Sequence, residues 1–196
     1  MDHTLLLALV GFAFATSVTP GPNNMMLLAS GANFGFRRTV PHMLGISLGH
    51  AFMVFIVGIG VAEVFHSHPH AELALKIVSV GYMLWLAWKI ANAAPPKEGE
   101  AKGRPFTFIQ AAAFQWVNPK AWAMALTAVT VYTTSDSWAS MAVVAGVFAA
   151  TNLPSVSVWA WAGQQLRRWL TTNRRLRVFN ISMAVLLVAS LWPVLA

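Results

Sequence analysis

The sequence predicts an all-α integral membrane protein, and three observations support this fold class. The chain is 57% hydrophobic and only 10% charged, whereas soluble domains carry about 25% charged residues. Mostly apolar segments recur along the chain, each near the roughly 20 residues that a membrane-spanning helix requires. Two of these segments contain proline motifs in their interior, and the two motifs lie almost half the chain apart.

Six apolar segments are expected to span the membrane. The first is broken by Pro20, Gly21 and Pro22, and the fourth is broken by Pro119. A proline inside a helix removes a backbone donor and clashes with the preceding turn, at a cost of about 3 kcal/mol. Two such breaks therefore need a structural or functional reason. The expected spans cover about 4–35, 40–62, 71–91, 106–132, 138–163 and 177–195.

The basic residues predict the orientation of the chain in the membrane. Of the 13 Lys and Arg residues, 11 lie in or beside the loops that follow the first, third and fifth segments. Because loops rich in Lys and Arg stay in the cytoplasm, both termini are predicted to face outward. The N-terminal run lacks the basic flank of a cleaved signal peptide, so we expect it to remain as a helix. The other two cations, Lys76 and Lys120, lie inside predicted helices.

The polar stretch 94–105 divides the chain into two halves of three segments each. Because three is odd, the second half enters the membrane from the opposite side, as in the inverted repeats of secondary transporters. Pro22 and Pro119 are 97 positions apart (119 − 22 = 97), which gives the two breaks matching places in the halves. We expect one membrane domain over 1–196, with repeats at about 1–93 and 106–196 joined by a cytoplasmic linker at 94–105.

Two glycine pairs have the G-x-x-x-G spacing, Gly31 with Gly35 and Gly45 with Gly49. This spacing allows two helices to approach closely in lipid. We interpret both pairs as packing within one chain, with the contact surface of a homodimer as the alternative.

The first break is a candidate binding site. A proline suits the first position of a helix, so Pro22 should begin a new helix there. The backbone N–H groups of Asn23, Asn24 and Met25 then lie free at the positive end of the helix dipole, which favours an anion. The side chain of Thr19 adds a further polar group.

The second break repeats this arrangement. Pro119 should begin a helix, Asn118 precedes it, and Lys120 adds a cation. Inverted halves would bring both helix starts together near the middle of the membrane, where they would suit a carboxylate or a zwitterion that contains one. The alternative is that both breaks are kinks that only shape the bundle. A charge at this depth usually faces a cavity, which favours a functional role for Lys120. The alternative is a lysine whose side chain extends to the outer membrane interface.

Histidines and one further asparagine complete the set of candidates. His50 lies in the second segment and is a candidate for proton coupling, since histidine changes its charge near neutral pH. The alternative is a histidine that is hydrogen-bonded between helices. Asn152, close to Pro154, predicts another kink with an inward polar group. The outer-loop residues His66, His68 and His70 allow a metal-ligand interpretation, but no metal site is expected there.

Several classes of function are excluded or disfavoured. The chain has no cysteine, so disulfides, thiolate metal sites and thiol redox chemistry are excluded. No nucleophile–base pair, nucleotide-binding loop or paired intramembrane carboxylate occurs, so neither an enzyme nor a bound cofactor is expected. The net charge of +7 comes from clusters between apolar runs, which indicates membrane topology rather than nucleic-acid binding.

These residues resemble the lysine-exporter/homoserine–threonine-resistance (LysE/RhtB) family of bacterial amino-acid exporters. The resemblance covers nearly the whole chain. It implies a six-helix exporter of amino acids or their derivatives in the bacterial inner membrane, driven by the proton gradient. Some members carry an acidic residue where this chain has His50. The marks are T-P-G-P-N at 19–23, the glycines at 45–49, N-P-K at 118–120, and the tail from Gly163 to Asn180 and Met183.

The sequence as a whole favours a proton-coupled exporter of a small amino acid or similar zwitterion. Lys120 would pair with the carboxylate of the substrate. A metal-ion exporter that uses the outer histidines, and a membrane scaffold without transport activity, are the alternatives. The sequence does not assign inward positions among Phe114, Gln115, Trp116 and Trp122, nor does it name the substrate.

Overall fold

The described part of the chain is helical. A computed structural model describes residues 1–61, 69–93, 104–134 and 137–192, and no strand occurs in these ranges. The all-α prediction is confirmed for them. His66, His68 and most of the predicted linker lie outside the described residues. The elements are α1 (His3–Val18), α2 (Pro22–Phe34), α3 (Phe36–Ile56), the π-helix η1 (Val57–Val61), α5 (Pro69–Ala91), α6 (Phe108–Phe114), the 3-10 helix η2 (Gln115–Val117), α7 (Pro119–Tyr132), α8 (Trp138–Arg167) and α9 (Asn173–Ala189).

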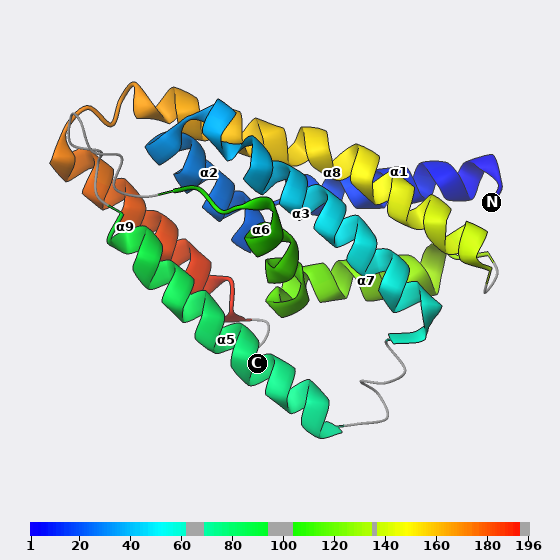
Figure 1. Ribbon diagram of the computed structural model, residues 1–196. Helices are drawn as coiled ribbons and strands as arrows, with labels where there is room; N and C mark the ends of the chain where they lie inside the picture. Colours follow the sequence, from blue (N-terminus) through cyan, green and yellow to red (C-terminus); the bar gives the residue numbers. More distant parts are fainter. Residues whose placement is uncertain (62–68, 94–103, 135–136, 193–196) are drawn as a thin grey trace.

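The first predicted segment consists of α1 and α2, which meet at the expected break. α1 ends at Val18, the backbone at Thr19 is extended, and Pro22 is the first residue of α2. Proline fits there because the first N–H of a helix has no partner within the helix. The two helices are bent by 54° relative to each other. The predicted break in the first segment is therefore confirmed (Figure 1).

The fourth predicted segment is broken in the same way. α6 begins after Thr107, whose hydroxyl accepts a hydrogen bond from the N–H of Gln110 while the Gln110 side chain accepts one from the N–H of Thr107. The helix tightens into η2, Asn118 is extended, and α7 begins at Pro119. The predicted break at Pro119 is confirmed, and α7 leaves it in a direction different from that of α6 (Figure 1).

Helix length and composition identify several membrane spans. Within the described ranges, three helical stretches are long and apolar enough to cross a membrane: 36–60, 73–91 and 138–167. The bent pair α1–α2 is a fourth if it counts as one span. α6, α7 and α9 have 7, 14 and 17 residues, fewer than the roughly 20 of a typical span. These lengths agree with a helical membrane protein but do not confirm six spans.

α3 and α8 hold the other helices together. α8 packs on α1, α2 and α3, and α3 also packs on α6, whereas α5 pairs with α9. The α5–α9 pair lies side by side at one edge of the molecule (Figure 1). This arrangement brings the middle parts of α3 and α8, at His50 and Asn152, against the place where the two breaks meet.

Glycines permit the closest helix crossings. A Cβ atom added at Gly31 of α2 would lie 2.1 Å from the carbonyl oxygen of Ala160 in α8. Cβ atoms at Gly45 and Gly49 of α3 would lie 2.3 Å and 2.5 Å from backbone atoms of α6. Gly35 ends α2 with a φ of 81°, a conformation that side chains disfavour. The glycines of both predicted pairs thus have roles within the chain, as interpreted from the sequence.

Basic residues gather at one end of the molecule, here called the basic end. It contains the α2–α3 junction, the C-terminal ends of α5 and α8, and the start of α9, far from the N-terminus in Figure 1. The N–H of Phe36 donates to Gln164 Oε1 at 2.6 Å, which joins α3 to α8 there. The described cations at this end are Arg37, Arg38, Lys89, Arg104, Arg167, Arg168, Arg174, Arg175 and Arg177.

Candidate functional site

The two helix breaks meet through Lys120, the second residue of α7. Its ammonium group donates to the carbonyl oxygen of Thr19 at 2.9 Å, to Thr19 Oγ1 at 2.9 Å and to the carbonyl oxygen of Pro20 at 3.3 Å. A lysine has three N–H donors, so each has an acceptor here. Lys120 is half-buried while Thr19 and Pro20 are exposed, so its side chain runs from the interior to the surface of the bundle.

A pair of side-chain amides joins the breaks a second time. Asn23 Nδ2 donates to Gln115 Oε1 at 2.9 Å, and Gln115 Nε2 donates back to Asn23 Oδ1 at 3.2 Å. Gln115 Nε2 also donates to the carbonyl oxygen of Ala111 at 2.9 Å. Gln115 is completely buried. The start of α2 and the η2 turn are therefore held together by a reciprocal amide pair.

The carbonyl groups at the end of α1 are satisfied by other elements. Asn24 Nδ2 donates to the carbonyl oxygens of Ser17 and Thr19 at 2.8 Å and 2.7 Å. Trp159 Nε1 of α8 donates to the carbonyl oxygen of Val18 at 3.1 Å. An unsatisfied backbone group costs several kcal/mol inside a membrane. The broken end of α1 is therefore tolerated in the membrane, because its carbonyl oxygens accept from Asn24, Trp159 and the Lys120 ammonium.

The two helix starts differ in how they are capped. Gly21 precedes α2 and provides no side-chain cap, which agrees with the expectation of free N–H donors at Asn23 and Asn24. The expectation is wrong for Met25, because its N–H donates to the carbonyl oxygen of Gly21 at 3.0 Å in the first turn of the helix. At the second break, Asn118 Oδ1 accepts from the N–H of Lys120 at 3.2 Å. The expectation of an open helix start is therefore wrong at this break, because a short extended asparagine can cap the helix that follows it.

A small polar cavity lies between the breaks. Its volume is about 20 Å³, which is room for a single water molecule and too little for an amino acid. Of the residues predicted to bind substrate or to couple protons, all but Thr19 line it directly. The complete lining is Thr16, Ser17, Gly21, Asn23, Asn24, His50, Asn118, Lys120, Ala121, Met124, Asn152 and Val156. We call this space the central cavity.

His50 lies on α3 at the wall of the central cavity, with its ring edge against Phe148 at a centroid distance of 5.2 Å. It is buried, and among the described residues neither of its ring nitrogens has a hydrogen-bond partner. The hydroxyl of Ser17, which lines the same cavity, has none there either. The interpretation of a histidine hydrogen-bonded between helices is thus wrong. A buried polar group without a protein partner needs another one, such as water or a ligand.

Two further side chains contribute to this site. Asn152 of α8 is buried, lines the central cavity and accepts a hydrogen bond from Ser47 Oγ at 3.4 Å, which confirms the predicted inward polar group. Gln115 was not assigned a direction by sequence reasoning. The sequence feature that could have indicated an inward position is that Gln115 is the one strongly polar residue in the apolar run 111–117. Among the residues with described positions, no three His, Cys, Asp or Glu side chains form a metal site.

The Asn23–Gln115 pair can be tested by a double-mutant cycle. Asn23→Ala and Gln115→Ala should each destabilise the protein, but the double variant should lose about 1 kcal/mol less than the sum of the two, because each single change already removes the shared hydrogen bonds. Detergent-induced unfolding followed by tryptophan fluorescence measures these free energies. Gln110→Ala, in the helix α6 that precedes η2 and bonded to Thr107, should be additive with Asn23→Ala.

The chain is similar to known proteins along almost its whole length. A family model described as LysE type translocator matches residues 14–190. The chain belongs to the LysE type translocator family. Similar proteins include the cysteine/O-acetylserine efflux proteins of Escherichia coli (strain K12) and Shigella sonnei (strain Ss046), each 33% identical over 193 residues that cover 96% of both chains. No solved structure matches.

The family membership confirms the resemblance inferred from the helix-break motifs. As a LysE type translocator the protein is a membrane transporter and not an enzyme. The T-P-G-P-N and N-P-K motifs of this translocator are the two stretches that meet at the central cavity.

Proposed function

We propose that this translocator exports a small neutral amino acid, or a derivative such as an O-acylated one, across the bacterial inner membrane. The chemistry of the central cavity carries this proposal. Lys120 provides a cation for a carboxylate, while Asn23, Asn24, Asn118 and Asn152 provide amides for the rest of a zwitterion. No acidic residue belongs to the described lining, so a cationic side chain has no counter-charge. The cysteine and O-acetylserine efflux proteins among the relatives support the same substrate class.

The proposed transport cycle separates and rejoins the two breaks. The central cavity is closed in this conformation, since it has room for one water molecule. Substrate enters when the breaks move apart, and its carboxylate replaces the Thr19 and Pro20 oxygens at the Lys120 ammonium. The substrate is then released on the opposite side of the membrane. The breaks close behind it, and the bonds from Lys120 to Thr19 and Pro20 form again. Thr19 is thus a competitor of the substrate for the same cation.

Helix packing supports two inverted repeats and six spans. α1 packs on α8 as α6 packs on α3, while α3 pairs with α8 and α5 pairs with α9. These are the contacts expected if 1–93 and 106–196 are two copies related by a two-fold axis in the membrane plane. In this arrangement the basic end lies in the cytoplasm, and rocking of one repeat against the other moves the breaks.

Proton coupling is assigned to His50 in this proposal. Its buried ring nitrogens have no partner in the described part of the chain and line the same cavity as Lys120. A proton from outside binds to the ring after substrate release and leaves on the cytoplasmic side. We expect His50→Gln to abolish the acceleration of efflux by a pH gradient while amino-acid exchange without a gradient continues. Normal acceleration in this variant, measured in proteoliposomes, would rule out the role of His50.

The substrate class is tested by a comparison of efflux with and without the protein. Cells or vesicles are loaded with radiolabelled amino acids, including cysteine, O-acetylserine, lysine and glutamate. The proposal expects rapid efflux of the first two and little change for the charged ones. Efflux of lysine alone, or of no amino acid at all, contradicts it.

A further inference from the structure

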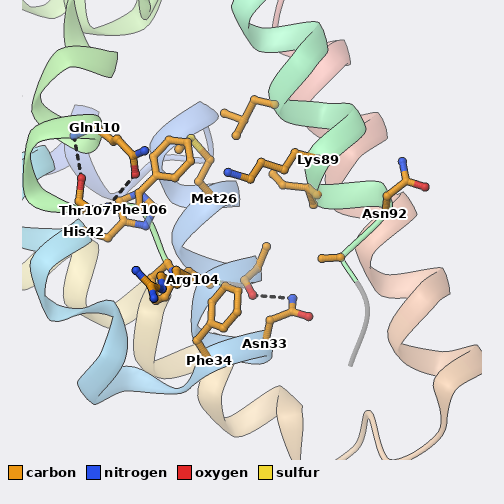
Figure 2. A pocket seen from close by; sticks show the side chains of 16 residues that line it. Met26, Asn33, Phe34, His42, Lys89, Asn92, Arg104, Phe106, Thr107 and Gln110 are labelled. Carbon is orange, nitrogen blue, oxygen red and sulfur yellow. Dashed lines mark hydrogen bonds between the residues drawn. The ribbon is translucent and has the colours of Figure 1, made fainter. Parts of the chain in front are cut away.

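A second, much larger cavity lies at the basic end. Its volume is about 640 Å³, and it is bounded by α2, α3, α5 and the stretch 104–107 (Figure 2). This volume falls within the range of small-molecule sites, roughly 300–1,000 Å³. None of the predicted site residues lines it. We call it the entry cavity.

The wall of the entry cavity contains polar atoms without partners. His42 of α3 is 2% exposed, and both of its ring nitrogens lack a hydrogen-bond partner among the described residues. Asn33 of α2 donates its Nδ2 to the carbonyl oxygen of Ala29 at 2.8 Å and to Asn180 Oδ1 at 3.1 Å. Because a carbonyl oxygen can only accept, the amide nitrogen must point that way. Among the described residues, the buried Asn33 Oδ1 is then left as an acceptor without a donor.

Cations lie on the α5 side and on the stretch 104–107. Lys89 extends from the end of α5 toward Phe106, with its Nζ 5.4 Å from the ring centroid (Figure 2). Phe106 also contacts His42, and the centroids of the two rings lie 5.3 Å apart. Arg104 also lines the cavity, and no acidic residue belongs to its described lining. The entry cavity thus offers two exposed cations and, deeper on α2 and α3, unused buried polar atoms.

We propose that the entry cavity is a second amino-acid site, which the substrate occupies before it reaches the central cavity. The inference rests on the proposed export function. The substrate carboxylate binds Lys89 and Arg104, while its ammonium donates to Asn33 Oδ1 and to a ring nitrogen of His42. A zwitterion matches this pairing better than a simple anion does, because an anion leaves both buried acceptors unused.

Two of the helices that line the entry cavity, α2 and α3, also line the central one. α3 carries His42 and His50, which are eight residues apart (50 − 42 = 8), or about 12 Å along the helix. Between the two cavities, Met26, Met43 and Ile46 belong to one buried apolar cluster. Export therefore has two binding steps, and this cluster is the barrier that opens between them. Methionine suits such a barrier because its side chain is unbranched and flexible.

The test measures uptake of radiolabelled cysteine by everted membrane vesicles, whose bath faces the basic end. Lys89→Gln, Arg104→Gln and His42→Leu should each raise KM by about tenfold with little change in kcat. His42→Leu should fold as well as the unchanged protein, because no protein hydrogen bond is lost. Arg174→Gln is the matched control, since Arg174 is an exposed cation at the same end that does not line the cavity.

Each outcome separates the inference from its alternatives. Unchanged KM in all three variants, with normal uptake by the unchanged protein, overturns the entry site but leaves the proposed function intact. No amino-acid uptake by the unchanged protein overturns the proposed function itself. The measurement is repeated in proteoliposomes of phosphatidylcholine with and without phosphatidylglycerol. A rise in KM that requires the anionic lipid assigns the cavity to a lipid head group and also overturns the inference.

Discussion

Lys120→Met is expected to reduce amino-acid efflux by about a hundredfold or more while the protein still reaches the membrane. The change removes the one cation in the described lining of the central cavity. Hydrogen bonds to charged groups contribute about 1.5–3 kcal/mol each, so the loss of a two-point contact with a carboxylate gives an effect of this order. The measurement is the initial rate of efflux, normalised to the amount of protein in the membrane fraction.

Two companion variants separate substrate binding from structure. Lys120→Gln keeps a donor for the oxygens of Thr19 and Pro20 but removes the charge, so it should restore stability without restoring export. Lys76→Met removes an exposed lysine of α5 and should leave export unchanged. If Lys120→Met exports at the normal rate, the ammonium serves only to join the two breaks.

Among the variants proposed, Gly163→Ala is expected to have the largest effect on stability. A Cβ atom there would lie 2.1 Å from the carbonyl oxygen of Leu28 and 3.0 Å from the N–H nitrogen of Ala32, both in the backbone of α2. Backbone cannot rotate away as a side chain can, so α2 and α8 must separate. Overpacking costs about 1–3 kcal/mol when side chains adjust, and we expect at least the upper end of this range. Thermal unfolding of the detergent-solubilised protein measures the loss.

The same helix provides the control for this change. A Cβ atom at Gly146 of α8 would meet nothing within 4 Å, and alanine has the higher helix propensity by about 1 kcal/mol. Gly146→Ala should therefore unfold at the same temperature as the unchanged protein or slightly above it. Equal melting temperatures for the two variants would show that the α2–α8 crossing tolerates separation.

The helix breaks were predictable because they depend on local chemistry. A proline that interrupts an apolar run must begin a new helix wherever it lies, so Pro22 and Pro119 marked both helix starts. The predicted inverted order of the halves implied that these starts converge, and Lys120 of the second break donates to Thr19 of the first. The partner of each polar group was harder to predict. The side chain of Asn118 could bind a substrate or cap the helix that follows it, and in the structure it caps that helix.

Other features depend on packing between distant segments. His42 lies in the same predicted segment as His50, but no local pattern shows that both rings are buried without partners. The entry cavity arises from the relative placement of α2, α3 and α5, which no periodicity encodes. The number of spans also depends on such contacts, because α6, α7 and α9 are short and reach their places by packing on longer helices.

The central claim is that substrate occupies the cavity between the two breaks, and a single cysteine tests it most directly. The chain has no native cysteine, so Met124→Cys places one thiol in the lining of the central cavity. We expect a small methanethiosulfonate reagent to modify it during transport, and saturating O-acetylserine to slow the modification. Arg174→Cys, at the exposed basic end, should react at the same rate with and without O-acetylserine. Equal rates at position 124 with and without O-acetylserine, in vesicles that transport it, would contradict the claim.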